Sequence, residues 1–315
     1  MTSRLRVGVV GVGYLGRVHA KIYADMDDVD LVGVVDIDAG IAHDIAKTYQ
    51  CGAHLDPSDL LGQVDAVSVV VPTSAHREVA EPFLQNGVHM LLEKPVAPTI
   101  KDAEAIINAS ENAGTILQIG HIERFNAGVM ALADRVREPR FIEVHRLGTF
   151  AGRATDVDVV TDLMIHDIDI VLSLVKSELC YISAMGTPVV TRHVDIANAR
   201  LEFKNGTVAN VTASRVSSKK FRRIRVFSED MYQALNFANQ QIDIVRPAAP
   251  SRDGDFPEIV TEQIRIEPRP PLDAELAHFV RTVRTGAQPF VTGRDGLAAL
   301  RVAMLVRDKI HACLS

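Results

Sequence analysis

The sequence predicts an α/β protein in which a doubly wound parallel sheet is followed by an α+β domain with a large, mostly antiparallel sheet. From Leu5 to about Gly120, short β-branched runs alternate with helical stretches, a pattern typical of a parallel sheet wrapped by helices. After about Arg124, longer strands with period-two alternation prevail. Because 315 residues exceed the usual size of one hydrophobic core, we expect two domains, over residues 1–122 and 123–315.

Five apolar runs supply the strands expected in the first domain. Their uniform content of valine, isoleucine and leucine indicates strands buried on both faces, as a parallel sheet between helices requires. The runs cover residues 5–11, 29–36, 66–72, 89–95 and 115–121.

The second domain is expected to begin with a helix over 126–137 and a strand over 139–148. Residues 197–215 then form the clearest hairpin, with Asn205 and Gly206 as its favoured two-residue turn. Two further strands are expected at 222–228 and 262–268, separated by a loop at about 246–257. Two helices, over 273–286 and 295–314, follow them.

Composition and charge limit the class of protein. With 47% hydrophobic and 23% charged residues, the chain has an ordinary globular composition, and its net charge of -6 argues against a nucleic-acid partner. Cys51, Cys180 and Cys313 lie far apart, which predicts neither a disulfide framework nor a metal site. The glycines near the start favour a strand over a secretory signal, and no run is long enough to span a membrane. We therefore expect a cytoplasmic protein that binds neither membrane nor nucleic acid.

A glycine-rich turn follows the first expected strand. It has the form G-x-G-x-x-G and opens a helix, whose N-terminus would stabilise a pyrophosphate. A carboxylate ends the second strand, where it would accept hydrogen bonds from a ribose and repel a ribose phosphate. This combination favours a Rossmann domain that binds NAD over a glycine-rich turn that binds nothing. The expected cofactor-binding residues here are Gly11, Gly13, Tyr14, Leu15, Gly16 and Asp36.

Further candidates follow later strands of the same sheet. Pro72, Thr73 and His76 come just after the third apolar run, at the edge where such sheets bind ligands, although they could equally cap the next helix. Glu93 and Lys94 follow the fourth run. We expect all five to contact the cofactor, with Lys94 near the nicotinamide, although a surface lysine would fit the sequence as well.

One apolar helix carries an unusual polar stripe. In residues 162–175, polar side chains recur at offsets of zero, four, seven and eleven, which places them on one face. The stripe could face a cleft or a buried polar network. Alternatively, the helix is partly buried, its carboxylates cap neighbouring elements, and its histidine is a hydrogen-bonded core residue. Asp167 falls off the stripe and is expected nearer solvent. The stripe consists of Asp162, His166, Asp169 and Ser173.

Together, the glycine turn, the Pro-Thr-x-x-His segment, the Glu-Lys-Pro sequence and the D-x-x-x-H of Asp162 and His166 resemble the Gfo/Idh/MocA oxidoreductase family. The resemblance spans nearly the whole chain. It implies that Lys94, Asp162 and His166 meet over the nicotinamide ring and are catalytic and substrate-binding residues, with no metal.

The segments "GHIERFN" and "VDVVTDLMIHDIDI" are most similar to the nucleotide-sugar branch of this family. That branch oxidises C3 of UDP-N-acetylglucosamine or its uronic acid so that an aminotransferase can add an amino group, as in the diamino-sugar route to lipid A. The resemblance implies sugar contacts by Arg124 and Asn126, although Arg124 could simply belong to a linker. A free sugar or inositol remains an alternative substrate, and a non-catalytic sensor of NAD and sugar is a further alternative.

A basic run, Lys219 to Arg225, allows a solvated strand edge or contact with the diphosphate of a UDP-sugar, whereas the acidic chain argues against nucleic acid. An antiparallel sheet with one face uncovered by helices predicts a homodimer or homotetramer through the second domain.

Overall fold

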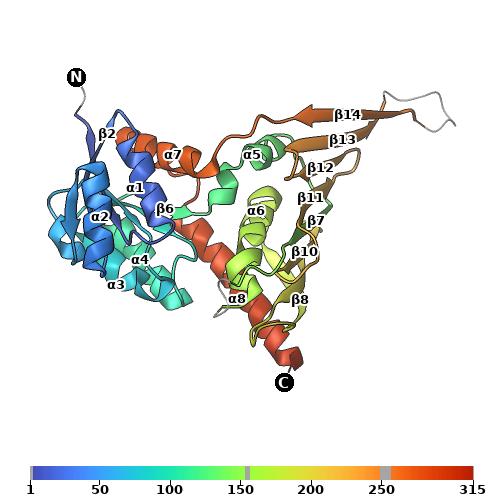
Figure 1. Cartoon of the computed structure of the whole chain (residues 1–315). Coiled ribbons are helices and arrows are strands. Elements are labelled where there is room, and N and C mark those ends of the chain that lie inside the picture. Colours follow the sequence, from blue (N-terminus) through green and yellow to red (C-terminus); the bar gives the residue numbers. More distant parts are fainter. Residues whose placement is uncertain (1–2, 153–156, 249–256, 315) are drawn as a thin grey trace. The chain divides into compact units, whose positions relative to one another are not determined.

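The computed structural model describes residues 3–152, 157–248 and 257–314, and the chain forms two compact units (Figure 1). Unit 1 contains Met1–Ile122 and Pro270–Leu297, and unit 2 contains Glu123–Arg269 and Ala298–Ser315. This division differs from the two continuous domains expected from the sequence. One boundary follows residue 122 in both, but Pro270–Leu297 packs with unit 1.

Unit 1 is built on a six-stranded parallel sheet with the order β3-β2-β1-β4-β5-β6. The order reverses between β1 and β4, and ligands bind at the carboxyl ends of strands beside such a reversal. The five expected strands are present, and a short sixth, β3, was not anticipated. The strands are β1 (Leu5–Val10), β2 (Val29–Val35), β3 (Gly52–His54), β4 (Ala66–Val69), β5 (His89–Glu93) and β6 (Leu117–Gly120).

Helices cover both faces of this sheet, as its apolar strands require. Helix α7 belongs here because Leu276 and Phe279 are fully buried in the core that β1, β2 and α1 form. The helical elements of unit 1 are α1 (Gly16–Ala24), α2 (Ala39–Tyr49), η1 (Pro57–Leu60), η2 (Thr73–Ala75), α3 (His76–Gln85), α4 (Ile100–Ala113), α7 (Pro271–Thr285) and the start of α8 (Gly293–Leu314).

Unit 2 is built on an eight-stranded sheet with the order β14-β13-β12-β11-β7-β10-β9-β8. Its pairs are antiparallel except for β7 with β10, which confirms the expected mostly antiparallel sheet. The strands are β7 (Phe141–Leu147), β8 (Leu179–Thr187), β9 (Ile196–Phe203), β10 (Val208–Ser214), β11 (Phe221–Phe227), β12 (Tyr232–Asn236), β13 (Gln241–Pro247) and β14 (Ile259–Arg265).

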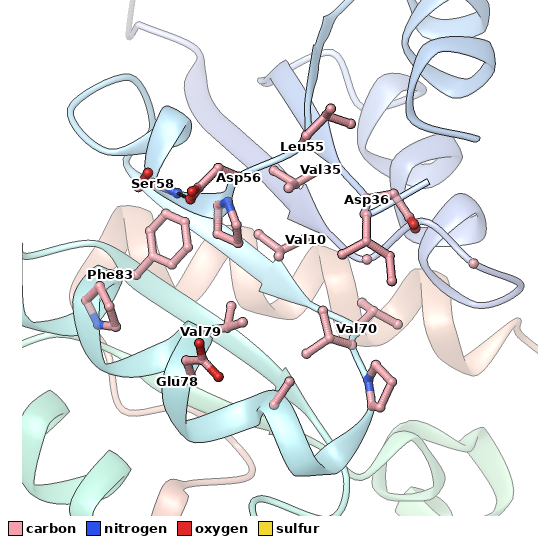
Figure 2. Close-up of a pocket in the computed structure, with 18 of the residues that line it drawn as sticks. Val10, Val35, Asp36, Leu55, Asp56, Ser58, Val70, Glu78, Val79 and Phe83 are labelled. Atoms are coloured by element: carbon pink, nitrogen blue, oxygen red, sulfur yellow. Dashed lines mark hydrogen bonds between the residues drawn. The ribbon is translucent and has the colours of Figure 1, made fainter. Parts of the chain in front are cut away.

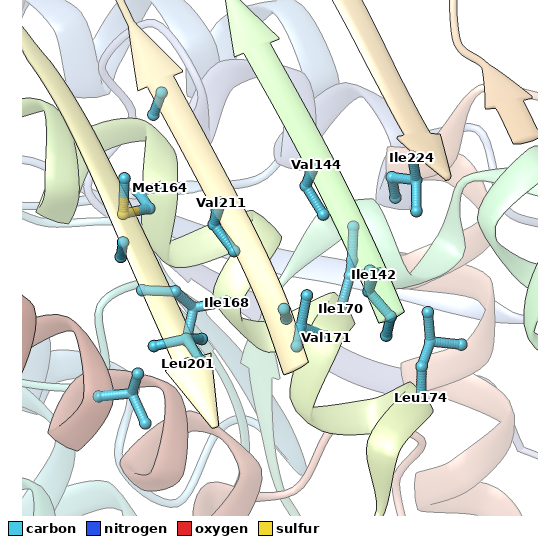
Figure 3. Packing of buried hydrophobic residues seen from close by; sticks show 14 of the residues in the cluster. Ile142, Val144, Met164, Ile168, Ile170, Val171, Leu174, Leu201, Val211 and Ile224 are labelled. Atoms are coloured by element: carbon cyan, nitrogen blue, oxygen red, sulfur yellow. The ribbon is translucent and has the colours of Figure 1, made fainter. Parts of the chain in front are cut away.

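One face of this sheet packs against α5 (Ala127–Ala133), α6 (Ile165–Val175) and the later turns of α8. Ile168 and Val171 of α6 are fully buried in one cluster with Val144 and Val211 of the sheet (Figure 3). The short 3₁₀-helix η3 (Ile122–Phe125) precedes α5, and the π-helix η4 (Val160–Met164) leads into α6. Among the described residues, none of the helices combines the length and the apolar character that a bilayer-spanning helix needs.

The turn between β9 and β10 differs from the one expected. The loop is Lys204–Gly206, three residues long, and the Phe203 N–H donates to the Thr207 carbonyl at 2.9 Å. Gly206 has a φ of +84°, whereas Asn205 is not among the described residues with positive φ. A two-residue type I′ turn needs positive φ at both central positions, so the glycine instead ends a three-residue loop.

Candidate cofactor and substrate site

A pocket of about 630 Å³ lies in unit 1 at the carboxyl ends of β1, β2 and β4 (Figure 2). This is the edge where the strand order reverses. Four of the expected cofactor-binding residues line it, namely Gly11, Gly13, Asp36 and Pro72.

Part of the pocket wall was missed from the sequence. It follows β3, a strand of three residues that is too short to show a hydrophobic period. Recognising that strand would have placed the segment after it at the same ligand-binding edge. The missed residues include Leu55, Asp56, Pro57, Ser58 and Leu61 after β3, and elsewhere in the wall Ile37, Ser74, Ala75, Glu78, Val79, Pro82 and Phe83.

The three glycines of the turn meet three different steric demands. Gly11 has a φ of +86°, and a Cβ atom there would lie 2.7 Å from the Val70 carbonyl oxygen. A Cβ atom on Gly16 would lie 1.8 Å from the Gly11 carbonyl oxygen, so α1 can approach β1 this closely only with glycine. Around Gly13, by contrast, no described heavy atom lies within 4 Å of the Cβ position, which leaves open space for a ligand beside the backbone.

The start of α1 suits an anion. Leu15 occupies the N-cap and makes no side-chain capping bond, and Tyr14 before it is 84% exposed. The first turn of α1 thus has no side-chain cap, although the Arg17 and Val18 N–H groups donate to the carbonyls of Gly13 and Leu15. An uncapped helix N-terminus that follows a glycine turn is typical of phosphate sites.

Asp36 is held in place by the backbone around it. Its Oδ2 accepts from the Val12 N–H at 2.9 Å and its Oδ1 from the Asp38 N–H at 3.0 Å. Each carboxylate oxygen keeps a further lone pair that a ribose hydroxyl can use. With open space at Gly13 and a carboxylate fixed in the same pocket, these residues fit the pyrophosphate and adenosine of NAD.

Replacing Asp36 by serine is expected to raise the Kd for NAD by about 10- to 100-fold, because hydrogen bonds to a charged group contribute about 1.5–3 kcal/mol. The preference for NAD over NADP should fall in the same variant. Asp56→Ser is the matched control, since Asp56 lines the same pocket but caps η1. Fluorescence titration of both reduced cofactors measures the constants, and an equal loss of NAD preference in the two variants would contradict the role given to Asp36.

His76 is a buried part of the scaffold in this structure. Its ring is 1% exposed, with Nε2 3.0 Å from the Val71 carbonyl oxygen and Nδ1 3.3 Å from that of Val96. Burial lowers the pKa of His76, so the neutral ring donates to one of these carbonyls. Thr73 opens η2, and neither residue lines the pocket. Cofactor contact by Thr73 and His76 therefore remains a prediction.

Lys94 directly follows β5. Its N–H donates to Oε2 of Glu93 at 3.2 Å, its side chain is half-buried, and the Lys94–Pro95 peptide bond is cis. The sequence could not give that isomer. Contact of Glu93 and Lys94 with a cofactor remains a prediction.

Asp162 and His166 lie one turn apart where η4 passes into α6, and both are half-buried. Asp158 holds the start of this helix, because its Oδ1 accepts from the N–H groups of Val160 and Thr161, each at 2.9 Å. Ser173, at the far end of the stripe, donates back to the Ile170 carbonyl at 2.7 Å. Asp162 and His166 belong to unit 2 and Lys94 to unit 1, so the expected meeting of the three stays a prediction.

Asp167 was expected near solvent, and this was wrong. It is fully buried, and Arg146 of β7 forms two parallel hydrogen bonds to it at 2.6 and 2.7 Å. Arg146 also pairs with Glu123 at 3.1 Å, as Arg222 does at 2.7 Å. Burial alone would raise the pKa of Glu123, but the two arginines outweigh burial and lower it. The buried ion pairs of this network link α6 to the sheet.

Arg124 and Asn126 each have a partner within unit 2. Arg124 lies 3.4 Å from Oδ1 of the buried Asp169. Asn126 is the N-cap of α5, and its Oδ1 accepts from the Gly128 N–H at 2.9 Å. This capping role was not anticipated, and sugar contact by either residue stays a prediction.

The basic run does not form a strand edge, which corrects that alternative. Strand β11 lies inside the sheet, between β12 and β7. Arg222 pairs with Glu123 and lies over the Phe237 ring, Arg223 lies 3.2 Å from the Tyr232 hydroxyl, and Arg225 pairs with Glu143. Protein groups therefore engage all three arginines, which favours a structural role over contact with a diphosphate.

Comparison with known proteins agrees with this architecture. Residues 5–121 match the model of an oxidoreductase family with an NAD-binding Rossmann fold, and residues 124–231 match the Gfo/Idh/MocA C-terminal domain. The chain is 38% identical to UDP-N-acetylglucosamine 3-dehydrogenase of Acidithiobacillus ferrooxidans, over 98% of both chains. It is 26% identical to inositol 2-dehydrogenase of Rhizobium meliloti, over 95% of this chain and 94% of that one.

Solved structures show the same fold. A structure of the Acidithiobacillus ferrooxidans enzyme superposes with a TM-score of 0.92 at 38% identity, covering 99% of both chains. Scyllo-inositol dehydrogenase of Lactobacillus casei superposes with a TM-score of 0.82 at 18% identity, over 98% of both chains. Both domain matches and the full-length relative show that this chain belongs to the Gfo/Idh/MocA family of NAD-dependent oxidoreductases.

Proposed function

We propose that this protein uses NAD to oxidise the C3 hydroxyl of UDP-N-acetylglucosamine to a ketone. The observation that carries the proposal is the 38% identity, over 98% of both chains, to an enzyme named for this reaction. Inositol dehydrogenases match at 25–28% identity, so the alternative of a free inositol has weaker support. The family membership favours an enzyme over a non-catalytic sensor.

The proposed chemistry needs a base for the hydroxyl proton and a group that stabilises the developing alkoxide. His166 is assigned as the base, since imidazole ordinarily titrates near neutral pH. Asp162, one turn earlier, is assigned to orient that ring and stabilise its cation. Lys94 stabilises the alkoxide and can share the proton transfer. Bound NAD supplies the acceptor for the hydride that leaves C3.

Arg124 and Asn126 are assigned to the sugar nucleotide, and an aminotransferase is expected to use the keto product. The protein is expected in the cytoplasm, as a homodimer or homotetramer that associates through unit 2.

Transfer of deuterium from C3-labelled UDP-N-acetylglucosamine to NAD tests the function directly. Enzyme at stoichiometric concentration prevents an unfavourable equilibrium from hiding the transfer, and mass spectrometry of the cofactor detects the label. Label is expected on NADH with this substrate and not with the same sugar labelled at C4. If NAD binds and no label moves, the substrate or carbon is wrong, and inositols and other nucleotide sugars should be tried next.

A further inference from the structure

The helical turn η4 has an uncommon form, and it carries one of the residues to which the proposed function assigns chemistry. In a π-helix an N–H donates to the carbonyl five residues back, and the Ile165 N–H donates to the Val160 carbonyl in this way. Such turns are rare and occur frequently at functional sites. Asp162 lies inside η4, and His166 lies just after it in α6. The direction of the Asp162 side chain therefore depends on the form of this turn.

Burial fixes the two ends of η4 but does not select its form. Val160 and Met164 are each 0% exposed and belong to the hydrophobic core of unit 2, and Figure 3 shows Met164 among the residues of that cluster. Residues four apart also share one face of an α-helix, so an ordinary α turn would bury the same two side chains. Other contacts must therefore hold this segment in the π form.

Asp158 supplies such contacts at the start of the turn. Its Oδ1 accepts from the N–H groups of Val160 and Thr161, each at 2.9 Å. Its main-chain carbonyl accepts from the Asp162 N–H at 3.1 Å and from the Thr161 hydroxyl at 3.3 Å. One residue thus accepts from the first three N–H groups of the turn that carries Asp162.

Two other parts of unit 2 hold Asp158 and its neighbour in place. Arg307 of α8 lies with its Nε 3.2 Å from Oδ2 of Asp158, whose side chain is 13% exposed. That Nε has no hydrogen-bond partner among the described residues, so the pair acts through charge, which water screens because Arg307 is 39% exposed. The Val159 N–H donates to the Val194 carbonyl at 2.9 Å. The start of η4 is therefore tied both to α8 and to the loop between β8 and β9.

The loop between β8 and β9 is itself held firmly. Asp195 is 0% exposed, and its Oδ2 accepts from the N–H groups of Val189, Val190 and Thr191 at 2.8, 2.7 and 2.8 Å. The Nε of Arg215 donates to its Oδ1 at 2.8 Å. A buried carboxylate with this many donors gives the start of η4 a fixed support.

We propose that Asp158 is a positioning residue, which keeps η4 in the π form and so holds Asp162 where it can orient the His166 ring. This inference rests on the proposed function for the roles of Asp162 and His166. Without the Asp158 cap, the segment is expected to rewind into an α turn around the same buried ends. Because an α turn holds fewer residues, rewinding rotates Asp162 relative to His166, and a small misplacement of a reacting group costs much of the rate.

Asparagine and glutamate at position 158 separate the place of the acceptor from its charge. Asp158→Asn keeps an acceptor at the same place and loses the charge, so kcat should stay within about threefold of the wild type. Asp158→Glu keeps the charge but moves the carboxylate by one methylene, so kcat should fall at least about tenfold. Single-turnover kinetics measures both. The reverse order, or equal activity of the two variants, would overturn the proposal.

Asp158→Ala removes the acceptor altogether. It should lower kcat at least about tenfold while the Kd for NAD changes by less than about twofold, because the cofactor pocket lies in unit 1. The control is Thr99→Ala, which removes the cap of α4, where the Thr99 hydroxyl oxygen accepts from the Asp102 N–H at 3.1 Å. It should lower the melting temperature to a similar extent and leave kcat unchanged. Equal losses of kcat in the two variants would show that Asp158 only stabilises its helix and would overturn the proposal.

A crystal structure of Asp158→Ala tests the cause without using activity. In that variant the Ile165 N–H should donate to the Thr161 carbonyl, four residues back, whereas in Asp158→Asn it should still reach Val160. An unchanged π turn in Asp158→Ala would overturn the proposal. If Asp158→Ala does not fold, Asp158→Glu takes its place in the same comparison. Should the wild type leave UDP-N-acetylglucosamine unoxidised, the proposed function has failed, and these structures alone decide about Asp158.

Discussion

Replacing Lys94 by methionine is expected to lower kcat by about 10²- to 10⁴-fold, the range typical of losing a group that transfers or stabilises a proton. Methionine keeps much of the length and apolar stem of lysine but has no charge and no donor. The Kd for NAD should change by less than about threefold, because the contact expected of Lys94 is with the nicotinamide, whereas the glycine turn and Asp36 are expected to hold the pyrophosphate and the adenosine. Single-turnover kinetics and cofactor titration measure the two quantities separately.

The matched control for this variant is Lys101→Met. Lys101 is exposed in the first turn of α4, so its loss should leave kcat unchanged. If Lys94→Met kept more than about a tenth of the activity, lysine would not be the group that stabilises the alkoxide. His166 would then be the first residue to test for the whole of the proton transfer.

Replacing Arg146 by methionine is expected to lower the free energy of unfolding by about 3–5 kcal/mol, which is typical of removing one partner of a buried ion pair. The variant leaves Asp167, 0% exposed, without its two parallel hydrogen bonds and removes one of the cations beside Glu123. Urea unfolding followed by circular dichroism measures the change.

An exposed ion pair supplies the control for Arg146. Arg200 lies 2.7 Å from Glu202, with side chains 45% and 37% exposed, so Arg200→Met should cost less than about 1 kcal/mol. Adding Asp167→Leu to Arg146→Met should recover part of the loss, because the buried charge is then gone. An equal cost for Arg146→Met and Arg200→Met would show that the buried network does not stabilise unit 2.

The sequence predicts the sheet of unit 1 well because its strands are continuous apolar runs, which is the pattern of strands buried on both faces. Val7 and Val9 of β1 and Val67 and Val69 of β4 are each 0% exposed. The glycine turn was equally predictable, since Gly11 and Gly16 each avoid a steric clash with residues less than about 60 positions away, and Gly13 leaves space for a ligand. Strand β3 was missed because three residues carry no measurable period.

The burial of Asp167 and Glu275 could not be predicted from the sequence, because it depends on residues that are far away in the chain. The helical period of residues 162–175 marks Asp167 as polar and off the stripe, but only the fold brings Arg146 of β7 to it. Glu275 looks in the sequence like one acid in an ordinary amphipathic helix. It is buried because α7 packs in unit 1. In the chain, α7 follows the first segment of that unit by more than 140 residues.

That return of the chain has a consequence for synthesis. During synthesis, β1 to β6 leave the ribosome long before α7. Until α7 is made, the apolar surface that Leu276 and Phe279 cover in the folded protein stays exposed. Most of unit 2, residues Glu123–Arg269, is therefore synthesised before Pro270–Leu297 completes unit 1. We expect a truncated chain of residues 1–122 to aggregate, and chaperones to bind nascent chains most strongly before residue 297 has emerged.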